Sequence, residues 1–403
     1  MRSTNPRSAP RGTTLNVRVL GSGYVLGSRA VWALNGDTAF ATTKVKTNAT
    51  TFVSSTELSA NITIQADATI DLYDVMVITP TGKKGIGIEL FEVLVQIVDL
   101  GAGAGSFAYA VNNLGQIVGD GGPGSGAFLW ENGSLRDLGA PPGRTWSSAY
   151  DINDSGQIVG TTWAPGVPAR AFLWTEATGM QLLPGTLGGT RSEAQGINEN
   201  GDIIGSSTLP GDTIHHAVMW RNGAMIDLQA ANFPSGTSYA WDLNDAGEVV
   251  GTYYGGGGRS FRWTAAAGME LIAPSTEYGN EALGINNTGQ IVGWKPPAAG
   301  QQNTAYLWSS GVFQHLGTLG GESSVSMALN EAGTVVGRAA GGRNGPAQQF
   351  AFIWTIVGGM KSLGALSEKD NAWALDINEQ NWVVGTSWGL KSGDYYATLW
   401  KVQ

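Results

Sequence analysis

The 403-residue sequence has no cysteine, only three histidines and few charged residues. Without cysteine it can form no disulfide framework and carry out no thiolate chemistry, which is compatible with a bacterial exterior. Charged residues make up 14% of the chain, against roughly 25% in an average globular protein. The net charge is −9 and the sequence contains no basic run, so this balance argues against nucleic acid as a partner.

Long apolar segments are also missing. No apolar run approaches the length of about 18 residues that spans a bilayer, so we expect no transmembrane segment. Residues 1–11 lack the apolar stretch of a signal peptide, and residues 1–13 are expected to form a disordered basic tail. No segment keeps an apolar period of about 3.6 residues, which predicts little helix.

Glycine, in contrast, is abundant at 60 residues, and it recurs within a repeat. An apolar residue precedes an asparagine, a glycine usually follows three positions later, and two apolar residues and another glycine come next. Successive asparagines are 41 to 48 residues apart: Asn112, Asn153, Asn198, Asn244, Asn286, Asn330 and Asn378. A matching series closes a short apolar run in each unit: Trp130, Trp174, Trp220, Trp263, Trp308, Trp354 and Trp400. Two series of equal length indicate seven units.

Each unit is expected to contain four short strands. In the second unit, residues 149–153 form the first strand and residues 157–160 the second, on either side of an Asn-x-x-Gly turn. Residues 171–174 form the third strand. The asparagine side chain can bond to the backbone two residues on, and the glycine tolerates a left-handed backbone. In the seventh unit, Asn381 replaces that glycine. Four antiparallel strands in about 45 residues are typical of one β-propeller blade.

The two ends of the repeat region predict ring closure. The last unit stops after Trp400 without a fourth strand, whereas an unmatched strand, residues 95–101, precedes the first unit. Its Asp-Leu-Gly matches residues 137–139. The sequence therefore predicts that residues 95–403 form a seven-bladed β-propeller of four-stranded blades, closed by an N-terminal strand that removes an open sheet edge.

The repeat resembles the bacterial extracellular HAF repeat family. The resemblance rests on Ile-Asn-x-x-Gly-x-Ile-Val-Gly and Ala-Phe-Leu-Trp, which occur together seven times with small variations. The family's His-Ala-Phe motif keeps its histidine only at His216, so a general role for that histidine is not expected here. The resemblance implies secretion and a repeat fold, and it implies no known reaction.

Residues 14–94 do not carry the repeat and resemble the IPT/TIG type of immunoglobulin-like domain. The matching residues include 21–24, 27–28 and 73–82. The resemblance implies an immunoglobulin-like β-sandwich that acts as a spacer or contact module on bacterial surface proteins. The sequence thus predicts an all-β protein with a tail, a sandwich and a propeller.

Function is expected on one face of the propeller, where the long loops emerge. These loops vary, whereas the Asn-x-x-Gly turns repeat nearly unchanged, and loops on a rigid scaffold are where specificity is usually built. The loops after the second strands carry the candidate ligand-binding residues: Trp163, Tyr253, Tyr254, Trp294, Trp388, Tyr395 and Tyr396. The loops that join successive units add Trp146, Phe233 and Tyr278. Many of these side chains could instead pack between blades.

Two motifs suggest other chemistry but have simpler interpretations. Residues 151–156 resemble the start of a calcium loop, yet the later acidic ligand is missing, so a turn is the better interpretation. Residues 385–389 fit G-x-S-x-G, but their first glycine already belongs to the repeat. We therefore expect no catalytic residue, metal or cofactor.

The first functional hypothesis is a non-catalytic, secreted or cell-surface scaffold that binds an extracellular protein or glycan, although no signal peptide is visible in this chain. One alternative is a structural subunit of an extracellular assembly, through self-assembly or contact with a membrane complex. Another is a carbohydrate-active enzyme with carboxylates from the propeller loops.

Overall fold

A computed structural model describes residues 1–403 with short gaps. The gaps are residues 38, 41–43, 66–67, 69–71, 123–125, 230–232, 234, 274–278, 299, 342–347, 367–370, 390–392 and 403, together with the side chains of residues 89 and 92–94. The described residues form strands and no helix, so none of them could cross a membrane as a helix. The chain divides into two compact units, residues 1–97 with 401–403, and residues 98–400.

The N-terminal unit consists of two four-stranded sheets over one core. The first sheet has the order β1 (Ser3–Asn5), β3 (Thr14–Leu20), β6 (Glu57–Ile64), β5 (Val45–Ser54). The second has the order β2 (Ser8–Pro10), β8 (Lys84–Leu94), β7 (Leu72–Ile78), β4 (Arg29–Leu34). Alternate residues of β6 are buried, as a strand with one face on a core requires.

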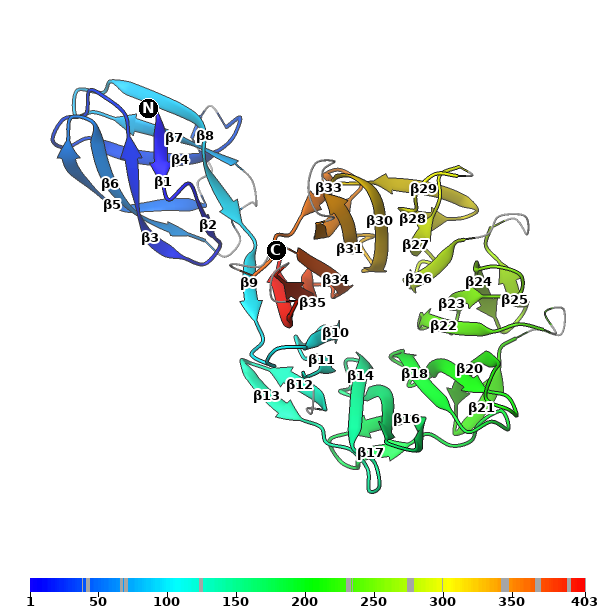
Figure 1. Cartoon of the computed structure of the whole chain (residues 1–403). Coiled ribbons are helices and arrows are strands. Elements are labelled where there is room, and N and C mark those ends of the chain that lie inside the picture. Colours follow the sequence, from blue (N-terminus) through cyan, green and yellow to red (C-terminus); the bar gives the residue numbers. More distant parts are fainter. Residues whose placement is uncertain are drawn as a thin grey trace. The chain divides into compact units, whose positions relative to one another are not determined.

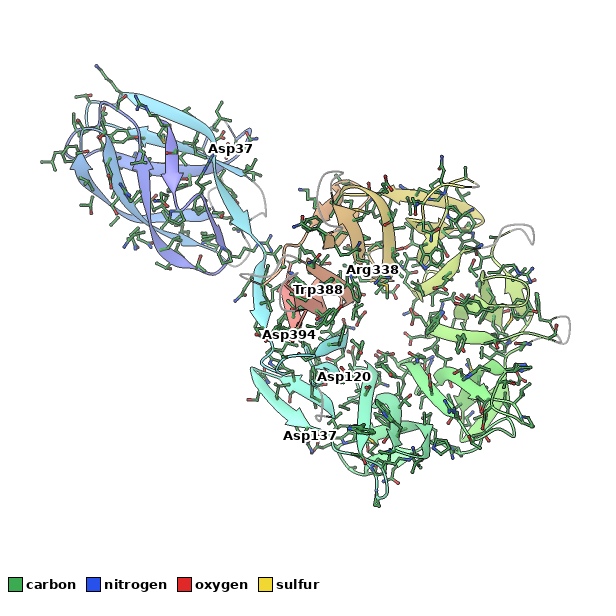
Figure 2. All side chains as sticks on the ribbon, viewed as in Figure 1. Asp37, Asp120, Asp137, Arg338, Trp388 and Asp394 are labelled. Atoms are coloured by element: carbon green, nitrogen blue, oxygen red, sulfur yellow. The ribbon has the colours of Figure 1, made fainter. Side chains whose placement is uncertain are left out.

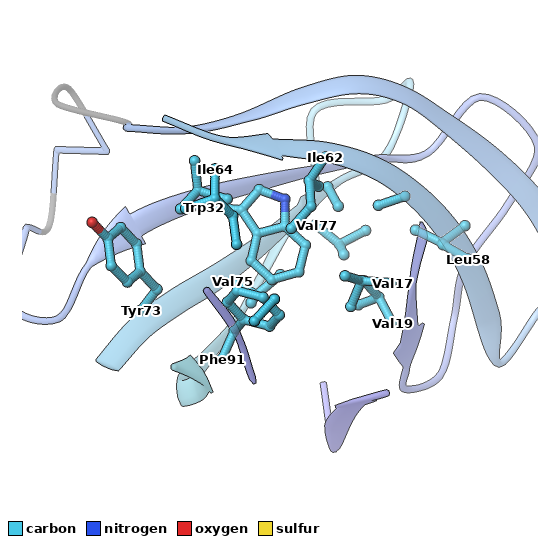
Figure 3. Close-up of a cluster of buried hydrophobic side chains, with 14 of the residues drawn as sticks. Val17, Val19, Trp32, Leu58, Ile62, Ile64, Tyr73, Val75, Val77 and Phe91 are labelled. Atoms are coloured by element: carbon cyan, nitrogen blue, oxygen red, sulfur yellow. The ribbon is translucent and has the colours of Figure 1, made fainter. Parts of the chain in front are cut away.

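The core of this unit draws on both sheets (Figure 3). Trp32 of β4 is fully buried and meets the Phe91 ring edge-on, with ring centroids 5.1 Å apart. Val17 and Ile62 of the first sheet belong to the same cluster. The two sheets therefore form a β-sandwich.

The expected disordered tail of residues 1–13 is wrong. β1 pairs antiparallel with β3, and β2 pairs parallel with β8. Thr4 is 2% exposed and donates a hydrogen bond from its hydroxyl to the Leu90 carbonyl, while Ala9 is 5% exposed. The segment lacks a longer apolar pattern because each of its strands is three residues long, pairs at a sheet edge and buries a single residue.

The described residues of the second unit form seven four-stranded antiparallel sheets, here sheets 1 to 7. Sheets 1 to 3 are β10 (Phe107–Val111), β11 (Ile117–Asp120), β12 (Ala127–Glu131), β13 (Ser134–Asp137); β14 (Trp146–Ile152), β15 (Ile158–Ala164), β16 (Val167–Thr175), β17 (Gly179–Leu182); and β18 (Ser192–Ile197), β19 (Ile203–Thr208), β20 (His215–Arg221), β21 (Ala224–Asp227). Sheets 4 and 5 are β22 (Ser238–Leu243), β23 (Val249–Tyr253), β24 (Arg259–Thr264), β25 (Gly268–Leu271); and β26 (Glu281–Ile285), β27 (Ile291–Lys295), β28 (Thr304–Ser309), β29 (Val312–Gly317). Sheets 6 and 7 are β30 (Gly320–Leu329), β31 (Val335–Gly341), β32 (Gln349–Thr355), β33 (Gly359–Ser362); and β34 (Asn371–Ile377), β35 (Trp382–Trp388), β36 (Tyr395–Lys401), β9 (Gln96–Asp99).

These sheets stand around a common centre, with the first strand of each sheet innermost (Figure 1). This is an all-β arrangement of the propeller type. The last sheet takes its fourth strand from before the first, because β9 pairs beside β36, and the Leu100 amide donates to the Ala397 carbonyl at 3.0 Å. The pairing expected between residues 95–100 and the C-terminal strand is thus present.

In each sheet, the glycine that follows the two apolar β-branched residues of the second strand is required by a close backbone approach. Every inner strand has a register shift beside this position, for example between Ala149 and Asp151. A Cβ on Gly160 would lie 1.9 Å from the Ser148 carbonyl oxygen. The equivalent distances at the other six glycines, Gly119, Gly205, Gly251, Gly293, Gly337 and Gly385, are 1.9 to 2.1 Å. The repeat glycine therefore makes room for the bulge in the neighbouring strand.

The Asn-x-x-Gly turns have the expected geometry. Gly156, Gly201 and Gly247 have φ of +72°, +79° and +74°, and Asn381 takes the same region at +56°. In the first turn, the Asn112 Oδ1 accepts hydrogen bonds from the backbone amides of residues 114 and 116, at 3.1 and 2.9 Å. One side-chain oxygen thus closes its own hairpin.

The same asparagines also join each sheet to the next. The Nδ2 of Asn112 donates to the Asn153 carbonyl at 3.1 Å, and each further asparagine does the same to its successor. Asn378 then donates back to the Asn112 carbonyl at 2.9 Å. These seven asparagines are at most 5% exposed. They form a closed circle of buried hydrogen bonds, which we call the amide ring.

A second closed circle of hydrogen bonds joins the same seven turns. The backbone amide after each asparagine donates to the side chain that follows the next asparagine, as from residue 154 to the Glu199 carboxylate at 2.9 Å. Its members are Asn113, Asp154, Glu199, Asp245, Asn287, Glu331 and Glu379. The acidic residue or amide in this position therefore also serves to join the sheets.

Candidate functional site

The ring unit has two dissimilar ends. One end carries the Asn-x-x-Gly turns with the two hydrogen-bonded circles. The other end, the long-loop face, carries the loops that follow the second and fourth strands, and its aromatic side chains fall into two groups. The first group spans sheets 7, 1 and 2, and the second spans sheets 3, 4 and 5.

A pocket of about 510 Å³ opens within the first group, between sheets 1 and 2. Phe107, Tyr109 and Asp120 line it from sheet 1, and Trp146 and Trp163 line it from sheet 2. Trp146 and Trp163 are cross-strand partners in β14 and β15, and their ring centroids lie 6.4 Å apart at 41°. Phe107 and Tyr109 stack on each other at 5.7 Å. We call this the aromatic pocket.

Asp120, at the end of β11, is the charged group of the aromatic pocket. The Ser148 hydroxyl donates to its Oδ2 at 2.7 Å, and the Tyr109 hydroxyl lies 3.4 Å from the same oxygen. Burial raises the pKa of Asp120 above its ordinary value, although hydrogen bonds from Ser148, Tyr109 and the Phe107 backbone act in the opposite direction. All these partners are neutral, and the described residues that line the pocket include no Lys, Arg or His.

The first aromatic group continues from the pocket into sheet 7. Phe107 stacks on Tyr395 at 5.0 Å, Tyr395 meets Trp388 at 5.0 Å, and Trp388 meets Trp373 at 4.8 Å. The Arg338 guanidinium lies 4.5 Å from the Trp373 ring centre, and burial lowers its pKa. Figure 2 shows Arg338, Trp388 and Asp120 on the same side of the ring. The group thus presents a positive charge at one end and a negative charge at the other.

The second aromatic group is centred on Tyr239 of β22. Its ring stacks on Trp241 at 5.7 Å and meets Tyr254 edge-on at 6.1 Å. Glu281 accepts hydrogen bonds from the Tyr254 hydroxyl at 2.6 Å and from the Trp294 Nε1 at 3.3 Å. Burial raises the pKa of Tyr254, and so does its bond to Glu281. Two expected contact residues therefore share one carboxylate.

The structure thus brings Trp163, Trp388 and Tyr395 into the first group, and Tyr254 and Trp294 into the second. Tyr253 differs from the expectation, because it is only 4% exposed. Its ring packs against Phe233 at 4.9 Å and its hydroxyl donates to the Ser235 carbonyl at 2.5 Å, so it forms the interior of its loop.

Tyr396 is half-buried beside Tyr395 in β36, and neighbouring residues of a strand point to opposite faces. Its carbonyl accepts hydrogen bonds from the hydroxyls of Thr386 and Thr398, at 3.2 and 2.7 Å. Tyr278 lies outside the described residues.

Sequence reasoning missed Phe107, Tyr109 and Asp120. One signal was available, because Asp120 directly follows a repeat glycine, where other units carry Thr161, Ser206, Thr252 or Thr386. Arg338 and Trp294 are the other exceptions at this position. A residue type that breaks a seven-fold pattern marks a place where one unit differs in function or packing.

The residues of the calcium-like motif have another role. The Asp151 Oδ2 accepts a hydrogen bond from the Ile197 amide of the next sheet at 2.7 Å, and Asp242 and Asp376 bond in the same way to the amides of residues 285 and 111, both at 2.8 Å. Among the described residues, no cluster of three or more His, Asp or Glu is arranged to hold a metal ion. These carboxylates join neighbouring sheets.

Ser387, the serine of the G-x-S-x-G match, is fully buried, and its Oγ accepts a hydrogen bond from the Thr398 hydroxyl at 3.0 Å. His216 belongs to sheet 3, not to sheet 7 with Ser387, and its Nδ1 lies 2.8 Å from the Asp227 Oδ2. A serine without exposure cannot reach a substrate, so this motif is part of the packing of sheet 7.

The Asn-turn end has a pocket of similar volume, about 510 Å³, between sheets 1 and 2. Its charged residues are satisfied by each other or by neighbouring side chains. Arg136 pairs with Glu176 at 2.5 Å, and the Gln116 amide donates to Glu131 at 3.0 Å. The aromatic pocket differs, because the described residues that line it include one carboxylate and no side chain of opposite charge.

No protein-family model matches the chain, and no curated protein matches it. Similar solved structures include TolB from Acinetobacter baumannii, with a TM-score of 0.38 and 12% identity over 61% of this chain and 64% of that one. A puromycin-hydrolyzing peptidase of Mycobacterium tuberculosis has a TM-score of 0.47 and 11% identity over 78% of this chain and 54% of that one. The chain thus covers less than two thirds of either protein, and our description of the fold rests on the strand pairing.

Proposed function

We propose that this protein is a non-catalytic binding and scaffold protein, secreted or on the cell surface, that contacts a protein or glycan through its long-loop face. In this proposal, residues 95–403 are a closed seven-bladed β-propeller of HAF-type repeats, and residues 14–94 are an immunoglobulin-like domain of the IPT/TIG type that spaces or positions it. The two strands before residue 14 complete the sandwich.

The observation that carries the proposal is the contrast between the two ends of the ring unit. At the Asn-turn end, the asparagine side chains and the residues after them bond to neighbouring sheets. At the long-loop face, Trp163, Trp388 and Tyr395 are half-buried, and Tyr254 is 41% exposed. Large and fairly rigid aromatic side chains supply contact area at a low cost in conformational entropy. The available contact area therefore favours the long-loop face.

The two aromatic groups can be tested separately. We expect Trp163→Ala and Trp388→Ala to weaken partner binding by about tenfold or more, because buried aromatic anchors contribute more than 1 kcal/mol at interfaces. The Trp294→Ala variant tests the second group in the same way. The measurement is binding to an array of bacterial surface glycans and to extracellular proteins captured by the wild type and identified by mass spectrometry.

The matched control is Ile226→Ala, which truncates a partly exposed apolar residue on the outer strand β21, away from the long loops. This variant should bind like the wild type. Unchanged binding by all three tryptophan variants would move the functional face elsewhere. Cleavage of a bound glycan by the wild type would replace this proposal with the carbohydrate-active alternative.

A further inference from the structure

The aromatic pocket combines two features that suit one kind of ligand. Four aromatic rings line it, from Phe107, Tyr109, Trp146 and Trp163. Among the described residues that line it, Asp120 is the one carboxylate; it is partly buried, and its side-chain hydrogen-bond donors there, Ser148 and Tyr109, are neutral. Its volume of about 510 Å³ lies within the usual range of small-ligand sites, about 300–1,000 Å³.

We propose that the aromatic pocket binds an organic ammonium group, with Asp120 as its counter-ion and the rings of Trp146 and Trp163 against its alkyl or methyl groups. The aromatic faces attract a cation through their quadrupoles, and this attraction strengthens when the cation is partly removed from water. The inference rests on the proposed function in one respect, since it places a specific contact on the long-loop face.

The environment of Asp120 supports a cation over a neutral sugar. Hydroxyl groups of a sugar would add further neutral donors to a carboxylate that already has Ser148 and Tyr109 within 3.4 Å. Burial outweighs these donors and raises the pKa of Asp120, so the ionised form lacks stabilisation. An ammonium group supplies the missing positive charge. Arg144, two residues before Trp146, does not line the pocket, and its guanidinium donates to the carbonyls of residues 162 and 168, at 2.6 and 2.8 Å.

The test uses defined probes and tryptophan fluorescence of the full chain. Choline represents a methylated ammonium, and N-acetyl-lysine amide represents a primary ammonium, as on a protein partner. The uncharged isostere of choline, dimethylbutanol, has the same shape without the charge, and maltose represents a neutral sugar. We expect saturable binding of at least one ammonium probe, about tenfold or more tighter than its neutral counterpart. The ammonium probe that binds more tightly shows whether the ligand is a methylated ammonium or a primary ammonium of a protein partner.

Asp120→Asn provides the matched variant, because it removes the charge and keeps the size. It should weaken the ammonium probe by about tenfold or more and leave dimethylbutanol unchanged, while the melting temperature stays equal or rises. Trp163→Leu should weaken the same probe. Glu270→Gln removes an exposed carboxylate of β25 and should bind like the wild type.

Equal binding of choline and dimethylbutanol, unchanged binding by Asp120→Asn, or a preference for maltose would each overturn the inference. If none of the probes binds, the inference is overturned as well. The proposed function has its own outcome: if Trp163→Ala loses a captured partner while Asp120→Asn keeps it, the binding face stands and the ammonium site fails.

Discussion

Three half-buried aspartates on the inner strands have pKa values above that of an ordinary aspartate. Burial raises the pKa of Asp242 to about 7 and that of Asp376 to about 6, although each carboxylate accepts backbone hydrogen bonds. The charge of Asp376 raises the pKa of Asp242 further. The pKa of Asp151 is also raised, mainly by burial. At neutral pH these residues therefore favour the protonated form more than ordinary aspartates do.

This shift predicts a pH dependence of stability. Because the folded state holds the Asp242 proton more tightly than the unfolded state, the free energy of unfolding should fall as pH rises from about 4 through about 7. Asp242→Asn should flatten this fall, whatever its effect on absolute stability. Urea unfolding at several pH values measures the slope, with Glu270→Gln as the control. Equal slopes in all three proteins would show that Asp242 does not titrate differently on folding.

A second prediction at this scale concerns the amide ring. Asn244→Ala removes the side-chain bonds to the Glu248 amide and carboxylate, at 3.0 and 3.1 Å, and it leaves the Asn286 carbonyl without its donor. We expect a loss of about 2 kcal/mol or more in the free energy of unfolding, since buried unsatisfied groups cost about 1–3 kcal/mol each. Asn303→Ala, at a half-buried loop position, should cost clearly less. Chemical denaturation measures both variants, and similar losses would assign the asparagine no special part.

At the scale of the element, the inner hairpin of each sheet depends on the glycine beside its bulge. Gly251→Ala would place a Cβ 2.0 Å from the Tyr239 carbonyl oxygen and 2.7 Å from the Phe261 ring. Neither backbone nor buried ring can move freely, so we expect destabilisation of about 2 kcal/mol or more. In Gly258→Ala the nearest atom is an ordinary 3.4 Å away, in the Tyr254 side chain. Comparable melting temperatures for these two variants would contradict the proposed role of the bulge.

The turns allow a finer comparison, between two substitutions at one position. Gly201 has φ of +79° and Asn381 occupies the equivalent place at +56°. Gly201→Asn should therefore be tolerated, whereas Gly201→Val should cost on the order of 1–2 kcal/mol more, because a β-branched residue resists this backbone region. Thermal unfolding of the two variants measures the difference, and an equal cost would show that the turn relaxes.

The sequence was most informative where a pattern is local. The spacing of Asn153 and Trp174 within a unit predicted its four strands, and the glycine of the turn predicted its backbone, because hairpins bring together residues close in the chain. The target of the Asn153 Nδ2, the carbonyl of Asn198, is 45 residues away and could not be read from the turn. Asp120 and Trp146 likewise converge only when two sheets meet.

At the scale of the molecule, the ring unit depends on a sheet assembled from both ends of its chain. β36 lies between β35 and β9, so it supplies partners to both. Removing residues 394–403 would leave two strand edges unpaired and would expose part of the cluster that contains Leu399 and Phe128. We expect a large fall in melting temperature and loss of a single cooperative transition. Calorimetry measures both, and an unaltered transition would show that closure contributes little.

The amide ring has a property that an open row of hydrogen bonds lacks: it has no end groups. Every Nδ2 has a carbonyl in front of it and every carbonyl has an Nδ2 behind it, including the pair of Asn378 and Asn112. An insertion or deletion of part of a repeat would interrupt this closed series of hydrogen bonds and leave one donor and one acceptor unsatisfied. Natural length variation in such a ring should therefore occur in whole units, by duplication or loss of one complete repeat, while the long loops are free to change residue by residue.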